Sequence, residues 1–63
     1  MAKIETNTLT LLRRLEQEGW QNVGGAKHDK FRHATKSGTI MVPRHRTLTE
    51  GVARSIHKAA GWI

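Results

Sequence analysis

The sequence predicts a small α+β fold with the order α-β-β-β-α, in which a three-stranded antiparallel sheet carries both helices on one face. Three observations predict it. Leucines recur at spacings of three and four between residues 9 and 15, the pattern of an amphipathic helix. Short alternating or β-branched segments follow, separated by glycine turns, as in an antiparallel meander. A second amphipathic segment begins near residue 49. With 63 residues, the chain is predicted to form a single domain, residues 1–63, with a thin core.

The first helix is predicted over residues 8–18. Its apolar stripe consists of Leu9, Leu12 and Leu15, with Leu11 beside them. Asn7 or Thr8 can cap the N-terminus, because each offers a side-chain oxygen to free backbone amides. Gly19 stands where a left-handed residue commonly ends a helix, so the helix is expected to stop just before it.

Three strands are predicted over residues 20–23, 28–34 and 39–42. In the second, the alternation places His28, Lys30 and Arg32 on one face and Asp29, Phe31 and His33 on the other. Phe31 is the only phenylalanine in the chain and the natural core residue. The face that carries His28 is therefore expected to face solvent.

A turn over residues 35–38 would place Ala34 opposite Thr39 and set the register of the hairpin. The resulting pairs are Phe31 with Val42, His33 with Ile40, Arg32 with Met41, Lys30 with Pro43, and His28 with His45. In this register, His28 and His45 are neighbours across the two strands.

The second helix is predicted to begin near Thr49, which can act as its N-cap. Its apolar stripe is read as Val52, Ile56, Ala59 and Ala60. His57 is expected on the exposed side. Gly61 ends the helix, and Trp62 and Ile63 form a hydrophobic tail.

The chain is strongly basic, with eleven Lys and Arg against five Asp and Glu, a net charge of +6 and a pI near 11.0. Between Lys27 and His45, Asp29 is the only acidic residue. Such a balance favours nucleic acid or an acidic protein as partner, although charge can also serve solubility alone. The predicted phosphate-binding band consists of Lys27, Lys30, Arg32, Arg44 and Arg46.

Several classes of protein are disfavoured. Cysteine is absent, so the chain has no disulfide framework and no thiolate zinc site. No two histidines have the spacing of metal ligands on a helix, and neither a metal nor a cofactor is predicted. No apolar run approaches the roughly 20 residues of a membrane span, and the N-terminus lacks a secretory signal pattern. A cytoplasmic protein is expected.

His28 is the main candidate for chemistry. It follows the flexible pair Gly24 and Gly25, which let the backbone approach a phosphate. Imidazole, with an unperturbed pKa of about 6.5, can exchange protons near neutral pH. The alternative is a solvated residue that touches phosphate without chemistry. His45 is a weaker candidate for the complementary acid or base; it can also contact phosphate, orient Arg44 or simply end the strand. His33, on the Phe31 face, is read as a half-buried structural residue or an ion-pair donor.

The chain also resembles the HicA toxins, the ribonuclease component of HicA–HicB toxin–antitoxin pairs. The resemblance covers nearly the whole chain and rests on Gly19-Trp20, Gly25-Ala26-Lys27-His28, Phe31-Arg32-His33, Met41-Val42-Pro43-Arg44-His45, Gly51-Val52-Ala53-Arg54-Ser55-Ile56 and Ala59-Ala60-Gly61-Trp62. It implies a fold similar to the double-stranded RNA-binding domain and an endoribonuclease that cleaves mRNA with one histidine. His28 occupies the position of that histidine.

The resemblance further implies a HicB-like antitoxin that masks the activity. The residues expected to bind RNA around His28 are Gly25, Lys27, Lys30, Arg32, Arg44 and His45. Two other readings remain open. One is a non-catalytic double-stranded RNA-binding module, and the weaker one is a DNA-binding subunit, although no helix presents an obvious recognition face.

Overall fold

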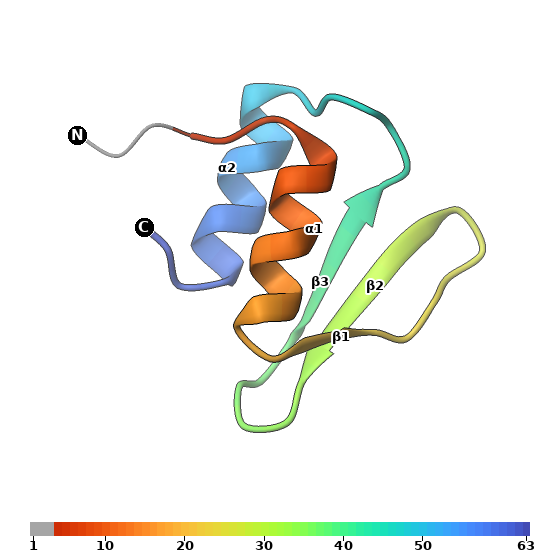
Figure 1. Ribbon diagram of the computed structural model, residues 1–63, viewed down its shortest axis with the longest axis vertical. Coiled ribbons are helices and arrows are strands. Elements are labelled where there is room, and N and C mark those ends of the chain that lie inside the picture. Colours follow the sequence, from red (N-terminus) through yellow and green to blue (C-terminus); the bar gives the residue numbers. More distant parts are fainter. Residues whose placement is uncertain (1–3) are drawn as a thin grey trace.

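The computed structural model describes residues 4–63 and confirms the predicted element order (Figure 1). Residues 1–3 of the predicted domain lie outside the described part. The elements are α1 (Thr8–Gln17), β1 (Trp20–Asn22), β2 (His28–His33), β3 (Thr39–Pro43) and α2 (Glu50–Ala59). The strands form one antiparallel sheet in the order β1-β2-β3. Both helices lie on one side of this sheet, so the arrangement is that of the double-stranded RNA-binding domain.

The helix ends form as the sequence predicts. The Asn7 side chain accepts a hydrogen bond from the Thr10 amide at 3.1 Å, and the Thr49 hydroxyl accepts one from the Val52 amide at 3.3 Å. These caps satisfy amides that have no partner within the helix. Gly19 has a φ of 95°, the left-handed conformation that lets the chain leave α1 and enter β1.

The face that α1 buries differs from the predicted one. Leu11 and Leu15 are almost fully buried, whereas Leu12 is half-buried and Leu9 is 57% exposed. The buried stripe therefore follows Thr8, Leu11 and Leu15, which also have helical spacing. The leucine-rich pattern fits two overlapping stripes, and the sheet selects one of them. Leu9 is left free to line a surface cavity.

The apolar stripe predicted for α2 is also partly wrong. Ile56 and Ala60 are buried as expected, but Val52 and Ala59 are exposed, and Ala53 and His57 face the core instead. His57 was expected on the surface and is only 2% exposed. Its ring packs edge-on against Trp62, with centroids 5.0 Å apart, and its Nε2 lies 3.3 Å from the Glu5 carbonyl oxygen. The imidazole of His57 can be buried here because its Nε2 keeps a polar partner, the Glu5 carbonyl oxygen, which offsets the cost of removing the ring from water.

The core lies between the helices and the sheet. Its members are Leu11, Leu15, Trp20, Phe31, Ile40, Val42, Leu48, Ala53, Ile56 and Ala60.

The β2–β3 register differs from the predicted one by two residues. Phe31 pairs with Ile40, Arg32 with Thr39, and His28 with Pro43. A shift of two preserves which face each residue occupies, so Phe31 remains in the core. The turn begins earlier because His33 Nδ1 accepts hydrogen bonds from the amides of Thr35 (3.1 Å) and Lys36 (3.3 Å). With those amides bound to the ring, the chain bends directly after β2, and His28 and His45 are not paired.

The segment before α1 pairs with the connection between β3 and α2. Asn7 and Thr47 form an isolated antiparallel bridge. The Thr8 amide donates to the Arg46 carbonyl at 3.1 Å, and the Leu48 amide donates to the Thr6 carbonyl at 2.9 Å. The Thr8 hydroxyl donates to the His45 carbonyl. This pairing holds the basic segment after β3 against the start of α1.

The C-terminal tail joins α2 to α1 through Trp62. Its indole N–H donates to Glu18 at 2.8 Å, and the Arg14 guanidinium lies 4.0 Å above its ring. The hydrogen bond from Trp62 lowers the pKa of Glu18 below its usual value of 4.5; partial burial opposes this effect, and Arg14 reinforces it.

Replacing Glu18 with glutamine is expected to remove a small part of the acid sensitivity of the fold. Because folding lowers the pKa of Glu18, its ionised form stabilises the protein above pH 4.5. This stabilisation is lost as the pH falls through the lower pKa of the folded state. Urea unfolding from about pH 6 down to about pH 3 should show a shallower decline in the variant. Glu16→Gln, at an exposed position on the same helix, is the matched control, and an equal effect of both changes would contradict the assignment.

Candidate functional site

Most of the sequence-predicted site residues lie toward the end of the sheet where β2 begins, but Arg32 lies at the other end of the strand, opposite Thr39. His28 is the first residue of β2 and lies opposite Pro43, the last residue of β3. Its side chain is half-buried rather than freely solvated. Nδ1 of the ring is buried and has no hydrogen-bond partner among residues 4–63. Buried polar atoms without a partner are uncommon and call for an explanation, of which a catalytic role is one.

Lys30 and Arg32 extend the His28 face along β2. Because strand side chains alternate between faces, both basic residues share the face of His28, and both are exposed. The two helices lie on the opposite side of the sheet (Figure 1). The site thus combines one imidazole and two cations on the side of the sheet that the helices leave open.

The loop before β2 is held tightly against this strand. Gly25 has no room for a side chain, because a Cβ atom there would overlap the His28 carbonyl oxygen and approach Cγ of Lys30 to 3.4 Å. Its neighbour Gly24 has a φ of 82° and donates its amide to the Asn22 side chain at 2.8 Å. The two glycines therefore have distinct roles: Gly24 turns the chain, and Gly25 permits contact between the loop and the backbone of the candidate residue.

Arg44 connects this loop to the sheet. Its Nη2 donates to the Gly25 carbonyl at 2.8 Å, and its Nε donates to the Asp29 carboxylate at 3.2 Å. The Arg44 side chain is 50% exposed and that of Asp29 is 22% exposed. A planar guanidinium can satisfy two acceptors in fixed directions. Arg44 thus acts as a clamp between the glycine loop and β2, and its charge is partly matched by Asp29.

The clamp predicts faster hydrogen exchange in the loop when Arg44 is changed. Arg44→Ala removes both hydrogen bonds, and Arg44→Lys cannot make both with the same geometry. Each hydrogen bond is worth about 0.5–1.5 kcal/mol, so the amides of Ala26 and Lys27 should exchange about tenfold faster in both variants. Arg46→Ala, at a nearby exposed arginine, should leave their exchange unchanged. Wild-type exchange in Arg44→Lys would show that charge alone holds the loop.

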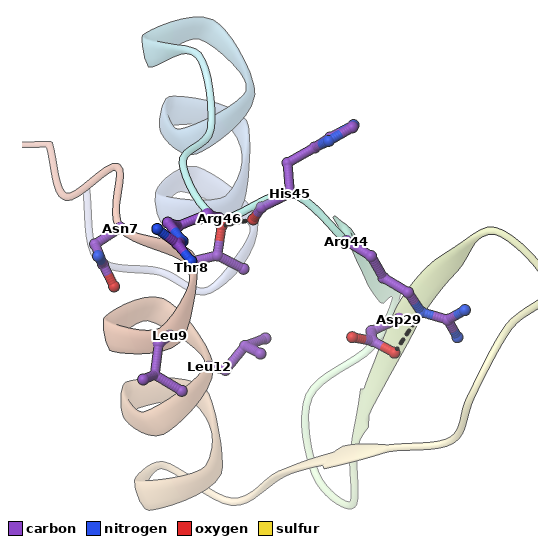
Figure 2. A pocket seen from close by; sticks show the side chains of 8 residues that line it. All are labelled: Asn7, Thr8, Leu9, Leu12, Asp29, Arg44, His45 and Arg46. Carbon is purple, nitrogen blue, oxygen red and sulfur yellow. Dashed lines mark hydrogen bonds and ion pairs between the residues drawn. The ribbon is translucent and has the colours of Figure 1, made fainter.

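The remaining predicted binding residues lie at the same end of the molecule. Lys27 is exposed in the glycine loop, and His45 and Arg46 are exposed in the segment after β3. Figure 2 shows the His45 side chain pointing out from this segment, away from Asp29. The observed register places His28 opposite Pro43, so the predicted cross-strand pair of His28 and His45 is wrong.

One feature of the site was not predicted from the sequence. Asp29 was assigned only to the core side of β2, yet it is the partner of Arg44. The sequence did hold a signal for this role, because Asp29 is the only acidic residue between Lys27 and His45. His33 was expected to be a half-buried structural residue, and this is confirmed. Its Nε2 donates to the Glu18 carbonyl at 2.8 Å and its Nδ1 accepts from the Thr35 amide, so the ring ties the end of β2 to the turns on either side of it.

Within residues 4–63, no three His, Asp or Glu side chains are grouped so that they could hold a metal ion. In the same part of the chain, no helix has the length and apolar character needed to cross a membrane.

Comparison with known proteins identifies the family. A family model described as HicA toxin of bacterial toxin-antitoxin matches residues 10–62. A search of curated proteins finds no match. The matched region includes all three strands, α2, the glycine loop, His28 and Arg44. The chain therefore belongs to the HicA toxin family of bacterial toxin–antitoxin systems.

Proposed function

We propose that this toxin is a metal-independent endoribonuclease that cleaves mRNA, with His28 as its catalytic acid or base. The observation that carries the proposal is the setting of His28. Its half-buried ring begins the central strand, next to a tightly packed glycine loop and on the same face as Lys30 and Arg32. Nδ1 is buried, so Nε2 is the nitrogen assigned to the substrate.

The proposed reaction is internal transesterification of RNA. A base removes the proton of a 2′-hydroxyl while that oxygen attacks the adjacent phosphorus. The bond from phosphorus to the 5′-oxygen breaks, and an acid gives that oxygen a proton. The products are a 2′,3′-cyclic phosphate and a 5′-hydroxyl. Histidine is suited to either proton transfer because its unperturbed pKa of about 6.5 lies near neutral pH.

The positive charge of the site is assigned to binding and to stabilising the pentacoordinate phosphorane. Lys30 and Arg32 share the face of His28, and Lys27 lies in the adjoining loop. Fixed cations at a site of developing negative charge lower the barrier most when they are already in place. Gly25 brings backbone close to His28. Arg44 and His45 complete the proposed RNA-binding set at the end of the strands.

A HicB-like antitoxin is the proposed partner that masks this site. The toxin carries a net charge of +6, and Lys30, Arg32 and Arg46 are exposed. Opposite potentials steer association and suppress wrong partners, so the antitoxin is expected to be acidic where it covers these residues. Since mRNA is the proposed substrate, the site of action is the cytoplasm.

Cleavage of a short RNA in EDTA tests the proposed reaction. The wild-type toxin should produce fragments with 2′,3′-cyclic phosphate ends, because attack by the 2′-oxygen requires no metal. A matched substrate with a single 2′-deoxy nucleotide at the cleaved position should resist, with a rate at least about 10²-fold lower. Equal cleavage of both substrates would exclude this mechanism. Retention of RNA without any product would instead favour the non-catalytic binding module.

A further inference from the structure

A cavity of about 460 Å³ lies between the first turns of α1 and the basic segment after β3 (Figure 2). Sites for small organic groups in proteins begin at about 300 Å³. The residues that line it are Asn7, Thr8, Leu9, Leu12, Asp29, Arg44, His45 and Arg46. The pairing of residues 6–8 with 46–48 holds its two walls together.

The lining combines an apolar wall with a charged one. Leu9 and Leu12 form the apolar wall, and Leu9 is 57% exposed although its neighbour Leu11 is buried. On the other side, one oxygen of Asp29 accepts from Arg44 Nε. Figure 2 shows the other carboxylate oxygen directed toward α1, into the cavity. Asp29 therefore offers a hydrogen-bond acceptor opposite an apolar wall, with Arg46 at the rim.

We propose that this cavity binds one unpaired nucleobase of the RNA, and that Asp29 selects a base with N–H donors, guanine above all. The inference rests on the proposed function, since it concerns the same substrate. Single-stranded RNA is recognised by bases that leave the stack, pack on protein side chains and form hydrogen bonds through their edges. The two leucines can cover the plane of a base, and the arginines attract the adjoining phosphates.

The position of the cavity fits a nucleotide next to the cleaved bond. His28 and Asp29 are consecutive in β2, with Cα atoms about 3.8 Å apart, and their side chains point to opposite faces. An RNA strand that crosses this end of the sheet can place a phosphate beside His28. A neighbouring base then enters on the side of Asp29. Arg44 touches both parts, because it binds Asp29 and the glycine loop.

The chemistry of the acceptor decides between bases. An ionised carboxylate only accepts hydrogen bonds. Guanine presents two adjacent N–H donors on its Watson–Crick edge, while adenine and cytosine present an amino group beside an acceptor. Uracil presents one N–H between two carbonyl oxygens, which a carboxylate repels. The Asp29 oxygen that accepts from Arg44 has a second acceptor site, so both carboxylate oxygens can meet the two guanine donors. A well-placed pair of hydrogen bonds to a base is worth about 1–3 kcal/mol of discrimination, so guanine should be favoured over uracil by about fivefold or more.

A binding selection on a pool of random single-stranded RNA tests the inference without requiring cleavage. His28→Ala protein is the bait, and the retained RNA is sequenced. Guanine should be enriched over uracil at one position by about fivefold or more. A second protein carries both His28→Ala and Asp29→Asn. The asparagine keeps an oxygen that can accept from Arg44, but its NH₂ group, a hydrogen-bond donor, can point into the cavity. The preference should then move toward uracil, whose carbonyl oxygens accept. Arg54→Gln, on an exposed part of α2, should leave the guanine preference unchanged.

A second variant guards against misfolding of Asp29→Asn. Leu9→Ala shortens an exposed residue and removes part of the apolar wall without adding a polar group, so it should weaken the guanine preference while the fold remains intact. Absence of any preferred base, or a guanine preference that both Asp29→Asn and Leu9→Ala leave unchanged, would overturn the inference. If the wild-type protein did not cleave RNA but the guanine preference were observed, the proposed nuclease activity would be refuted and the proposed base site would remain supported.

Discussion

Replacing His28 with alanine is expected to abolish RNA cleavage while leaving the fold and RNA binding intact. Loss of a general acid or base lowers a rate by about 10²–10⁴-fold. The fold should tolerate the change because the ring is half-buried and its Nδ1 has no hydrogen-bond partner within residues 4–63. No native hydrogen bond of the ring is then lost in the described structure. Initial rates on a labelled RNA, with urea unfolding and RNA binding measured in parallel, check the three parts of this expectation.

Two further histidine variants sharpen the result. His28→Gln keeps an amide that can form hydrogen bonds but cannot exchange a proton near neutral pH, so it should be as inactive as alanine. His45→Ala should lower the rate by less than about tenfold, because the observed register separates His45 from His28 and leaves it with binding rather than proton transfer. Wild-type cleavage by His28→Gln would remove His28 from the proposed chemistry.

Gly25→Ala is expected to have the second largest effect. A Cβ atom at this position would overlap the His28 carbonyl oxygen, which belongs to the backbone of β2 and cannot move freely. The loop must therefore shift away from the strand and weaken its contact with Arg44. Forced overpacking of this kind destabilises by about 1–3 kcal/mol. Because the loop adjoins His28, cleavage should also fall by about tenfold or more.

Gly51→Ala is the matched control for this experiment. Gly51 lies in α2, and nothing lies within 4 Å of the place that its Cβ would occupy. Alanine is the better helix former, so this variant should gain up to about 1 kcal/mol in the free energy of unfolding. The free energies of unfolding of the two variants should thus change in opposite directions, and Gly51→Ala should cleave RNA at the wild-type rate. A Gly25→Ala protein with wild-type stability and rate would contradict the tight contact between loop and strand.

The fold could be predicted because its signals are local. Asn7, Thr49 and Gly19 mark helix ends by the chemistry of their own side chains or backbone, and the alternation around Phe31 sets the faces of β2. The register could not be predicted, because it depends on the His33 ring, which binds the Thr35 and Lys36 amides and starts the turn early. Sequence patterns treat such a side chain only as polar or apolar, and they do not show what it binds.

The candidate site could be predicted only in part for the same reason. His28, Lys30 and Arg32 follow from alternation along a single strand. The clamp requires Arg44, Gly25 and Asp29, which come together only once β3 has paired with β2. The buried face of α1 and the burial of His57 depend on the packing of both helices against the sheet. Contacts between distant segments decide these features, and periodicity within one segment does not report on them.

The pairing of residues 6–8 with 46–48 affects when a newly synthesised chain can complete the site around His28. The adjoining hydrogen bond from Thr8 to the His45 carbonyl joins residues 37 positions apart in the sequence. Such long-range contacts form late in folding because the entropy of closing the intervening chain must be offset first. A nascent chain that has emerged from the ribosome only as far as the end of β2 already contains His28. It does not yet contain Arg44, which holds the glycine loop against β2. The toxin is thus expected to reach its active geometry only after the third strand and the following connection have emerged.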